Sequence, residues 1–175
     1  MLQAAIDACD MARVAACLDV DAVVDKGVKA AMKDEAAMRE ANKFPAVALA
    51  LALGASSGST EVLCGLFSSE VKEYVRHGVV SGAFAGKPRE GASVYGGMFG
   101  KVFRGGDKDR RVFGPATVKS RSGATARIAT SLAEGRKARV YPLELVARRE
   151  KGVWRIVEVA NIAELIALGM KKEAQ

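Results

Sequence analysis

Few residues of this chain are of the types that carry acid–base or metal chemistry. His77 is the only histidine, and single cysteines stand at positions 9, 17 and 64. Zinc sites are built from clustered Cys and His side chains, and no such cluster occurs here. His77 follows Glu73 by one helical turn, which favours a surface pair over a catalytic base. We therefore predict no metal site and no catalytic residue.

A phosphate-binding loop is the second chemistry to test, because residues 86–106 are rich in glycine. In the P-loop pattern, Gly100-Lys101 would need a glycine five residues before Gly100 and a hydroxyl residue after Lys101. The chain has Tyr95 and Val102 at those positions. The dinucleotide-binding pattern fails as well, since Tyr95 stands where its first glycine belongs. We therefore predict no cofactor, and interpret residues 87–110 as a crossover from helices to sheet.

The elements that must position any site are organised around the stretch from Arg139 to Asn161. Two apolar, β-branched runs flank Glu150-Lys151-Gly152, which predicts a β-hairpin whose turn needs one residue with positive φ. We expect this hairpin to be the central pair of strands. In the second run Val153, Val157 and Val159 alternate with Trp154 and Ile156, so apolar side chains would occupy both faces. Only one of these two sets can pack against the chain's own helices. The apolar face that is left uncovered predicts a homodimer through the sheet.

Two earlier runs complete a predicted four-stranded antiparallel sheet. Val112 to Lys119 tolerates Pro115 only at a sheet edge, and Ala124 to Leu132 follows. A final helix from Ile162 to Met170 could cover part of the second face. The fold class is therefore α+β, in a single domain with a helical part at residues 1–86 and the sheet and last helix at 111–175.

Helical periodicity dominates the first part of the chain. The predicted segments are Leu2 to Leu18, a helix capped by Asp19 that fades near Asn42, a buried apolar helix from Pro45 to Leu53, a break at 54–59, a helix from Thr60 to Phe67, and a further helix capped by Ser68 or Ser69. These helices are expected on the concave side of the sheet.

Charge is distributed unevenly along the chain. The net charge is +7, and Lys101 to Arg155 holds 15 basic against 5 acidic residues. Arg127, Arg148 and Arg155 form the predicted basic surface. The favoured interpretation is a solvated outer face of the sheet. Attraction of an anionic polymer or anionic lipid is the alternative, with nucleic acid the less expected partner.

The order of helices followed by a curved sheet ending in Gly152-Val153-Trp154-Arg155-Ile156 resembles the nuclear-transport-factor-two-like superfamily, the cone-shaped α+β fold. The segments AIDACDMARVAACLDVDAVV, LFSSEVKEYV and REKGVWRIVEV are similar to a bacterial envelope family of unknown function within it. Enzymes of the superfamily use Asp, His or Tyr inside the cone. The resemblance leaves Asp10 and Tyr141 for such chemistry, and Asp10, Tyr74, Tyr141 and Trp154 as ligand-binding candidates.

The sequence thus predicts a non-catalytic module that binds a small ligand or a protein partner. An isomerase- or cyclase-type enzyme using the cone pocket is the alternative, and binding of anionic polymer or lipid through the basic sheet is a third. The longest apolar run, Pro45 to Leu53, is too short to span a bilayer. Met1 leads directly into an amphipathic helix, so we expect a cytoplasmic protein, or an envelope or periplasmic one if a targeting segment has been removed.

Overall fold

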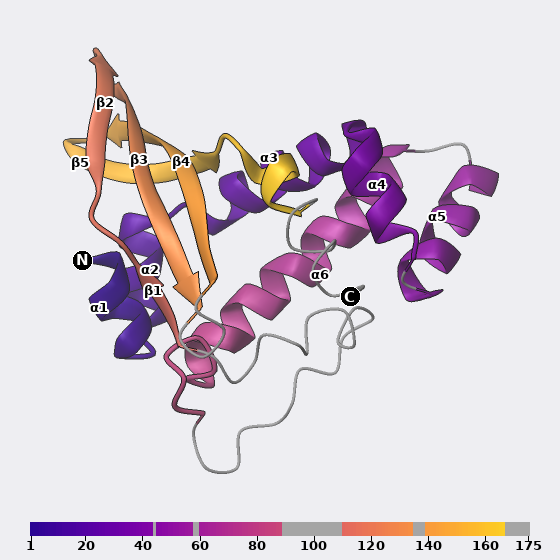
Figure 1. The fold of residues 1–175 in the computed structure, drawn as a ribbon, viewed down its shortest axis with the longest axis horizontal. Helices are drawn as coiled ribbons and strands as arrows, with labels where there is room; N and C mark the ends of the chain where they lie inside the picture. Colours follow the sequence, from indigo (N-terminus) through magenta and orange to yellow (C-terminus); the bar gives the residue numbers. More distant parts are fainter. Residues whose placement is uncertain (44, 58–59, 89–109, 135–138, 167–175) are drawn as a thin grey trace.

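The computed structural model of the protein describes residues 1–43, 45–57, 60–88, 110–134 and 139–166. The helical part comes first and the antiparallel sheet second, which confirms the predicted α+β class (Figure 1). The helices are α1 (Leu2–Asp7), α2 (Met11–Cys17), α3 (Val20–Lys33), α4 (Glu35–Ala41), α5 (Pro45–Ser57) and α6 (Thr60–Val80). The strands are β1 (Arg111–Phe113), β2 (Thr117–Ser122), β3 (Thr125–Glu134), β4 (Arg139–Glu150) and β5 (Val153–Val159).

Aspartate caps divide the first two predicted helices into four. The Asp10 carboxylate accepts a hydrogen bond from the backbone N–H of Arg13 and begins α2, so Leu2 to Leu18 is not one helix. Asp34 accepts in the same way from the Ala37 N–H at 2.8 Å, at the junction of α3 and α4. Asp19 caps α3 as predicted, accepting from the Ala22 N–H at 3.0 Å. Each carboxylate satisfies a donor that has no partner within its own helix.

The helices on either side of residues 58–59 differ from expectation in two ways. α5 is not buried all round, because Leu49 is 63% exposed while Val47 and Ala50 are buried. α6 is one continuous helix of 21 residues, with no new start at Ser68. Ser68 is instead buried within α6, and its side chain is hydrogen-bonded to the Asp25 carboxylate of α3.

The sheet has the predicted antiparallel order, with its first strand in two pieces. β1 and β2 both pair with β3, which pairs with β4, which pairs with β5. The interruption between β1 and β2 contains Pro115, at the sheet edge where proline is tolerated. Gly114 holds the broken strand to β3 there, because its N–H donates to the Ser131 carbonyl at 2.9 Å and its carbonyl accepts from the Thr130 hydroxyl.

The β4–β5 hairpin is present, but it is not the central pair of strands. β5 lies at the sheet edge, where Leu18 forms a parallel bridge with Ile156 and the Asp19 N–H donates to the Ile156 carbonyl. β3 and β4 are therefore the central strands. The turn contains two residues with positive φ, Lys151 at 49° and Gly152 at 85°, as the common two-residue hairpin turn requires.

A bulge in the β4–β5 pairing changes which side chains of β5 are buried. The register moves from Val146 opposite Glu158 to Ala147 opposite Ile156, so Val157 is an extra residue. Val157 is 6% exposed, whereas Val153 is 54% exposed. The three valines therefore do not form one exposed apolar patch. The homodimer stays a prediction, but of the three valines only Val153 is exposed enough to support it.

The main cluster of buried apolar side chains lies among the helices, while the sheet carries further buried residues such as Leu143 and Leu145. The cluster is built from Ala5, Val14, Val20, Val24, Tyr74, Val79 and Phe84, contributed by α1, α2, α3, α6 and the turn after α6. The helices do not all cover the concave side of the sheet: α2 and α3 pack against β5, while α5 packs against α6 (Figure 1).

The described part of the last predicted helix is a helical turn at residues 162–166. It packs on α3, where the Ile162 side chain approaches Gly27, and so does not cover the outer face of the sheet. Asn161, just before this turn, accepts from the Glu144 N–H and donates to the Pro142 carbonyl of β4. Most of the glycine-rich crossover, the loop after Glu134 and residues 167–170 lie outside the described residues.

Candidate functional site

An apolar cavity of about 400 Å³ lies in the helical part, among the described residues. Only apolar side chains and one glycine line it: Val23, Val24, Gly27, Val28, Ala31, Met32, Ala37, Met38, Ala41, Val47, Phe67, Val71, Val75, Ile162 and Ile166. They come from α3, α4, α5, α6 and the turn at 162–166. We call this hollow the apolar cavity.

The sequence of α3 explains why the cavity opens beside it. Val24, Val28 and Ala31 recur at spacings of three and four residues, so they share one face of the helix. Lys26 and Lys29 fall on other faces and are exposed. The turn at 162–166 packs beside Gly27, where a Cβ atom would lie 3.4 Å from the Ile162 Cγ1 atom, at ordinary contact distance.

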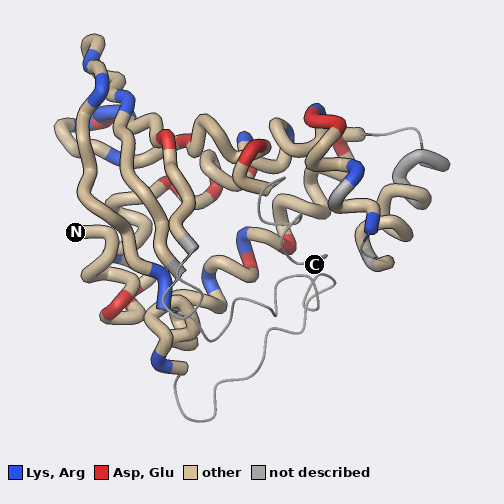
Figure 2. Tube along the Cα trace, in the orientation of Figure 1, with Lys and Arg blue, Asp and Glu red and all other residues tan. Residues whose placement is uncertain are grey.

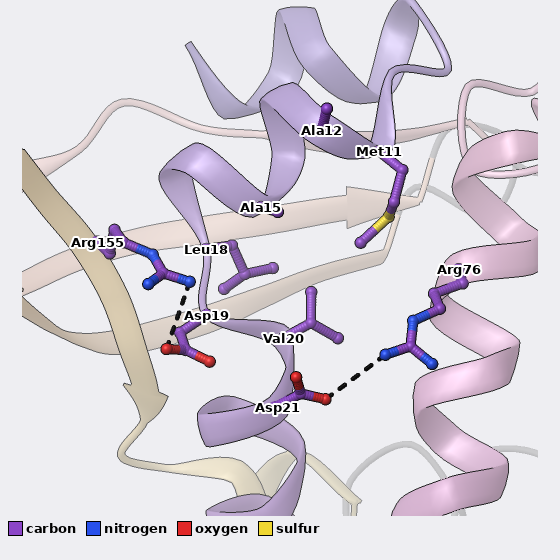
Figure 3. A pocket seen from close by; sticks show the side chains of 9 residues that line it. All are labelled: Met11, Ala12, Ala15, Leu18, Asp19, Val20, Asp21, Arg76 and Arg155. Carbon is purple, nitrogen blue, oxygen red and sulfur yellow. Dashed lines mark ion pairs between the residues drawn. The ribbon is translucent and has the colours of Figure 1, made fainter.

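The second hollow, of about 290 Å³, is a charged pocket between α2, the start of α3, α6 and β5 (Figure 3). Its apolar wall is made by Met11, Ala12, Ala15, Leu18 and Val20. Its charged groups are Asp19, Asp21, Arg76 and Arg155. In Figure 3 the two arginines lie on opposite sides of the pocket, each directed towards one aspartate.

The charges of this pocket are largely matched within the chain. The Arg155 guanidinium lies 3.3 Å from the Asp19 carboxylate, and Arg76 lies 3.7 Å from Asp21. The other Asp19 oxygen already caps α3. The Nε atom of Arg155 is buried without a hydrogen-bond partner. With two carboxylates beside two guanidiniums, the pocket offers no net charge that would select an anion or a cation.

An ion-pair network joins α3 to α6 between the two hollows. The Lys72 ammonium lies 2.8 Å from the Asp25 carboxylate and 3.5 Å from that of Asp21. The hydrogen bond from Lys72 lowers the pKa of Asp25, and the same bond raises the pKa of Lys72. Both groups are therefore held in their charged forms, which suits a structural pair and not a proton donor or acceptor working near neutral pH.

The structure does not bring the four predicted ligand-binding residues together. Asp10 caps α2, and Tyr74 is buried in the helical core, edge-on to Phe84 at 5.5 Å between ring centroids. Tyr141 pairs with Leu132, whereas Trp154 pairs with Arg149 at the other end of β4. Eight residues of strand separate those two positions, about 26 Å. None of the four lines either hollow.

The three predicted basic-surface residues do share one face of the sheet. Arg148 lies opposite Thr125 on β3 and opposite Arg155 on β5, and Arg127 stands two residues along from Thr125. Arg127 and Arg148 are exposed, whereas Arg155 is directed to Asp19. His77 is half-buried on α6 and lines neither hollow.

Three further observations bear on function. No group of three or more His, Cys, Asp or Glu residues in the described ranges is arranged to hold a metal ion. Among the same residues, no helix has the length and apolar character needed to cross a membrane. Comparison of the chain with protein-family models, curated proteins and solved structures finds no match.

Proposed function

We propose that this chain is a non-catalytic binding module whose ligand is a small apolar molecule held in the apolar cavity. The observation that carries the proposal is the cavity itself: about 400 Å³, with a lining that is apolar throughout. Its volume falls within the range of ligand pockets in proteins. An aliphatic chain or a neutral apolar ring system fits such a lining, because it leaves no polar group unpaired.

The chemistry of the lining supports an apolar ligand over water as the occupant of the cavity. Its side chains offer water no hydrogen-bond partner, and apolar surface left in water is unfavourable by about 25 cal/mol for each Å². An occupant that fills part of this volume recovers dispersion contacts that its lining otherwise lacks.

The alternative of an isomerase- or cyclase-type enzyme has less support. It requires an acid or base positioned at a cavity, and the carboxylate of Asp10 is engaged in capping α2. The resemblance to the nuclear-transport-factor-two-like superfamily is likewise a proposal. The helix-then-sheet order favours it, but the apolar cavity lies among the helices and not inside the curved sheet.

Calorimetric titration of the full chain with lauric acid and with lauryl alcohol tests the binding function. We expect saturable binding with a negative heat-capacity change, which marks apolar burial. Ala31→Leu adds three carbon atoms inside the cavity and should weaken binding, since Ala31 lines it. Ala30→Leu is the matched control, with the same substitution on the same helix at a residue outside the lining.

Equal binding by the two variants would refute the assignment of the site. If neither lipid binds and sedimentation shows an association that Ala31→Leu abolishes, the cavity receives a protein segment and the small-ligand proposal is wrong. Far-ultraviolet circular dichroism of both variants checks that any loss is not caused by unfolding.

A further inference from the structure

One end of the sheet carries a concentration of positive charge. Both hairpin turns lie at this end, because Thr125, just after the β2–β3 turn, pairs with Arg148, just before the β4–β5 turn. Figure 1 shows the β2–β3 end extending beyond the helices. We define the basic tip as Lys119, Arg121, Arg127, Arg148, Arg149 and Lys151, all of them exposed.

Negative charge is almost absent from this region. Within residues 119–127 and 147–155, Glu150 is the only carboxylate. Figure 2 shows Lys and Arg gathered on the projecting ends of the strands, whereas Asp and Glu lie mainly on the helices. The uneven charge seen along the sequence therefore becomes a local positive field at one end of the fold.

Most of these cations have no carboxylate partner among the described residues. Lys119, Arg127, Arg149 and Lys151 take part in no ion pair with any described residue. Arg148 has one at the 4.0 Å limit, with Glu150, and both side chains are more than half exposed. An exposed pair of that length contributes little.

The register adds like-charge repulsion on one face. Arg148 stands directly opposite Arg155 across β4 and β5, a placement that disfavours the sheet unless a counter-charge is present. Asp19 supplies that charge to Arg155. No carboxylate of the described residues pairs with the neighbouring Arg127. A bound anion bridging this face would relieve the repulsion.

The cations occupy both faces of the tip. Arg127 and Arg148 share the face that includes Thr125, whereas Arg121 and Arg149 share the opposite face with Ala126 and Ala147. A flat lipid surface can meet only one face of a sheet. A β-ribbon entering the major groove of a B-form DNA duplex, about 12 Å wide, has phosphates on both sides.

We infer that the basic tip docks on the phosphate backbone of duplex DNA. Lysine and arginine supply charge-assisted hydrogen bonds to phosphate, and hydroxyls add neutral donors. Ser120 lies opposite Arg127, and Ser122 lies opposite Thr125, so hydroxyl groups alternate with the cations on that face. The contacts are to phosphate and not to base edges, so binding is independent of sequence. The site is separate from the apolar cavity.

Fluorescence anisotropy with a labelled random-sequence DNA duplex, over a range of salt concentrations, tests the inference on the full chain. Six cations predict a slope of log affinity against log salt near −5, at about −0.9 for each phosphate neutralised. The variant Lys119→Gln/Arg127→Gln/Arg149→Gln should reduce the slope to about −3 and weaken binding in ~0.1 M salt by about two orders of magnitude.

The control variant, Lys29→Gln/Lys33→Gln/Arg39→Gln, removes the same charge from exposed positions on α3 and α4. It should keep the original slope. Equal losses in both variants would show that only net charge matters and would overturn the inference, as would absence of duplex binding by the original chain. Co-sedimentation with phosphatidylserine vesicles completes the test: if the tip variant loses vesicles but not duplex, the surface binds membranes instead.

Discussion

Replacing Gly78 by alanine tests the packing of the helical core most directly. Gly78 lies in α6, where its backbone is helical, so a methyl group alone would favour the helix by about 1 kcal/mol. The new Cβ, however, would overlap the Cε1 and Cζ atoms of the Phe84 ring and lie 2.8 Å from its Cδ1 atom. The sign of the effect depends on whether the ring can move.

Three neighbours hold the Phe84 ring in place. Tyr74 packs edge-on against it, the Arg111 guanidinium lies 4.9 Å from its centroid, and the Phe84 N–H donates to the carbonyl of Gly78 itself. Overpacking of a well-packed core costs about 1–3 kcal/mol, so we expect Gly78→Ala to destabilise by up to about 2 kcal/mol after the helix gain is subtracted.

Gly65 supplies the matched control on the same helix. A Cβ there would meet no atom within 4 Å, so Gly65→Ala should stabilise the protein by up to about 1 kcal/mol. Urea unfolding followed by circular dichroism measures both variants. Opposite signs are expected. If both substitutions stabilise the protein equally, Phe84 does not pack on Gly78 and the core described here is wrong. Phe84→Leu should restore part of the stability lost in Gly78→Ala, because it removes the ring.

Two further predictions concern the sheet and the ion network. Trp154 is half-buried with Arg121 over its ring at 4.9 Å, so Trp154→Ala should cost about 1–2 kcal/mol in urea unfolding, below the 3–5 of a core aromatic; a larger loss would place the ring in the core. The Asp25–Lys72 pair should contribute less than about 1 kcal/mol, because the Asp25 side chain is 45% exposed. Because the Asp25 pKa is lowered, this contribution is complete above the ordinary value of 3.8 and is lost as pH falls through the folded-state pKa. Because the Lys72 pKa is raised, it is complete below 10.5 and is lost as pH rises through the folded-state pKa. Unfolding of Lys72→Gln across pH should lack both changes, and an unaltered pH profile would contradict the assignment.

Local patterns predicted the strands well because each turn is encoded by adjacent residues. Lys151-Gly152 and Gly123 adopt positive φ where the sequence changes from one apolar run to the next. The edge position of β5 was not predictable in this way. It depends on Leu18, which lies far away in the chain and bridges Ile156. The order of a sheet is set by such distant contacts, whereas its turns are set locally.

The helix boundaries likewise depend partly on adjacent residues and partly on contacts with distant ones. Asp10 and Asp34 are both of a residue type favoured at N-caps. Apolar periodicity continues past each of them, however, so the sequence predicted continuous helices at both positions. At Ser68 the sequence predicted a helix start that the structure does not have, because serine shortly before an acidic residue favours an N-cap. Its hydroxyl is instead satisfied by Asp25 on α3, so α6 continues without a new start.

The candidate site was the least predictable part. Residues were selected by side-chain chemistry, and the apolar cavity is lined by side chains that individually read as ordinary core. The sequence feature that could have indicated the cavity is that α3 and α4 carry more apolar residues than contact with the sheet alone would bury. Recognising a cavity requires knowing that α4 and residues 162–166 meet beside α3, which is again a distant contact.

The two proposed surfaces are far enough apart to be tested independently. α3 has 14 residues and so spans about 21 Å. Its start contacts β5 through Asp19, and Ala31 in the cavity lining lies twelve residues further along, about 18 Å. Effects of substitutions more than about 7–10 Å apart without shared partners add. Ala31→Leu should therefore leave duplex binding unchanged, and the tip variant should leave lipid binding unchanged. Each proposal can fail without the other, because one depends on volume among the helices and the other on charge at the end of the sheet.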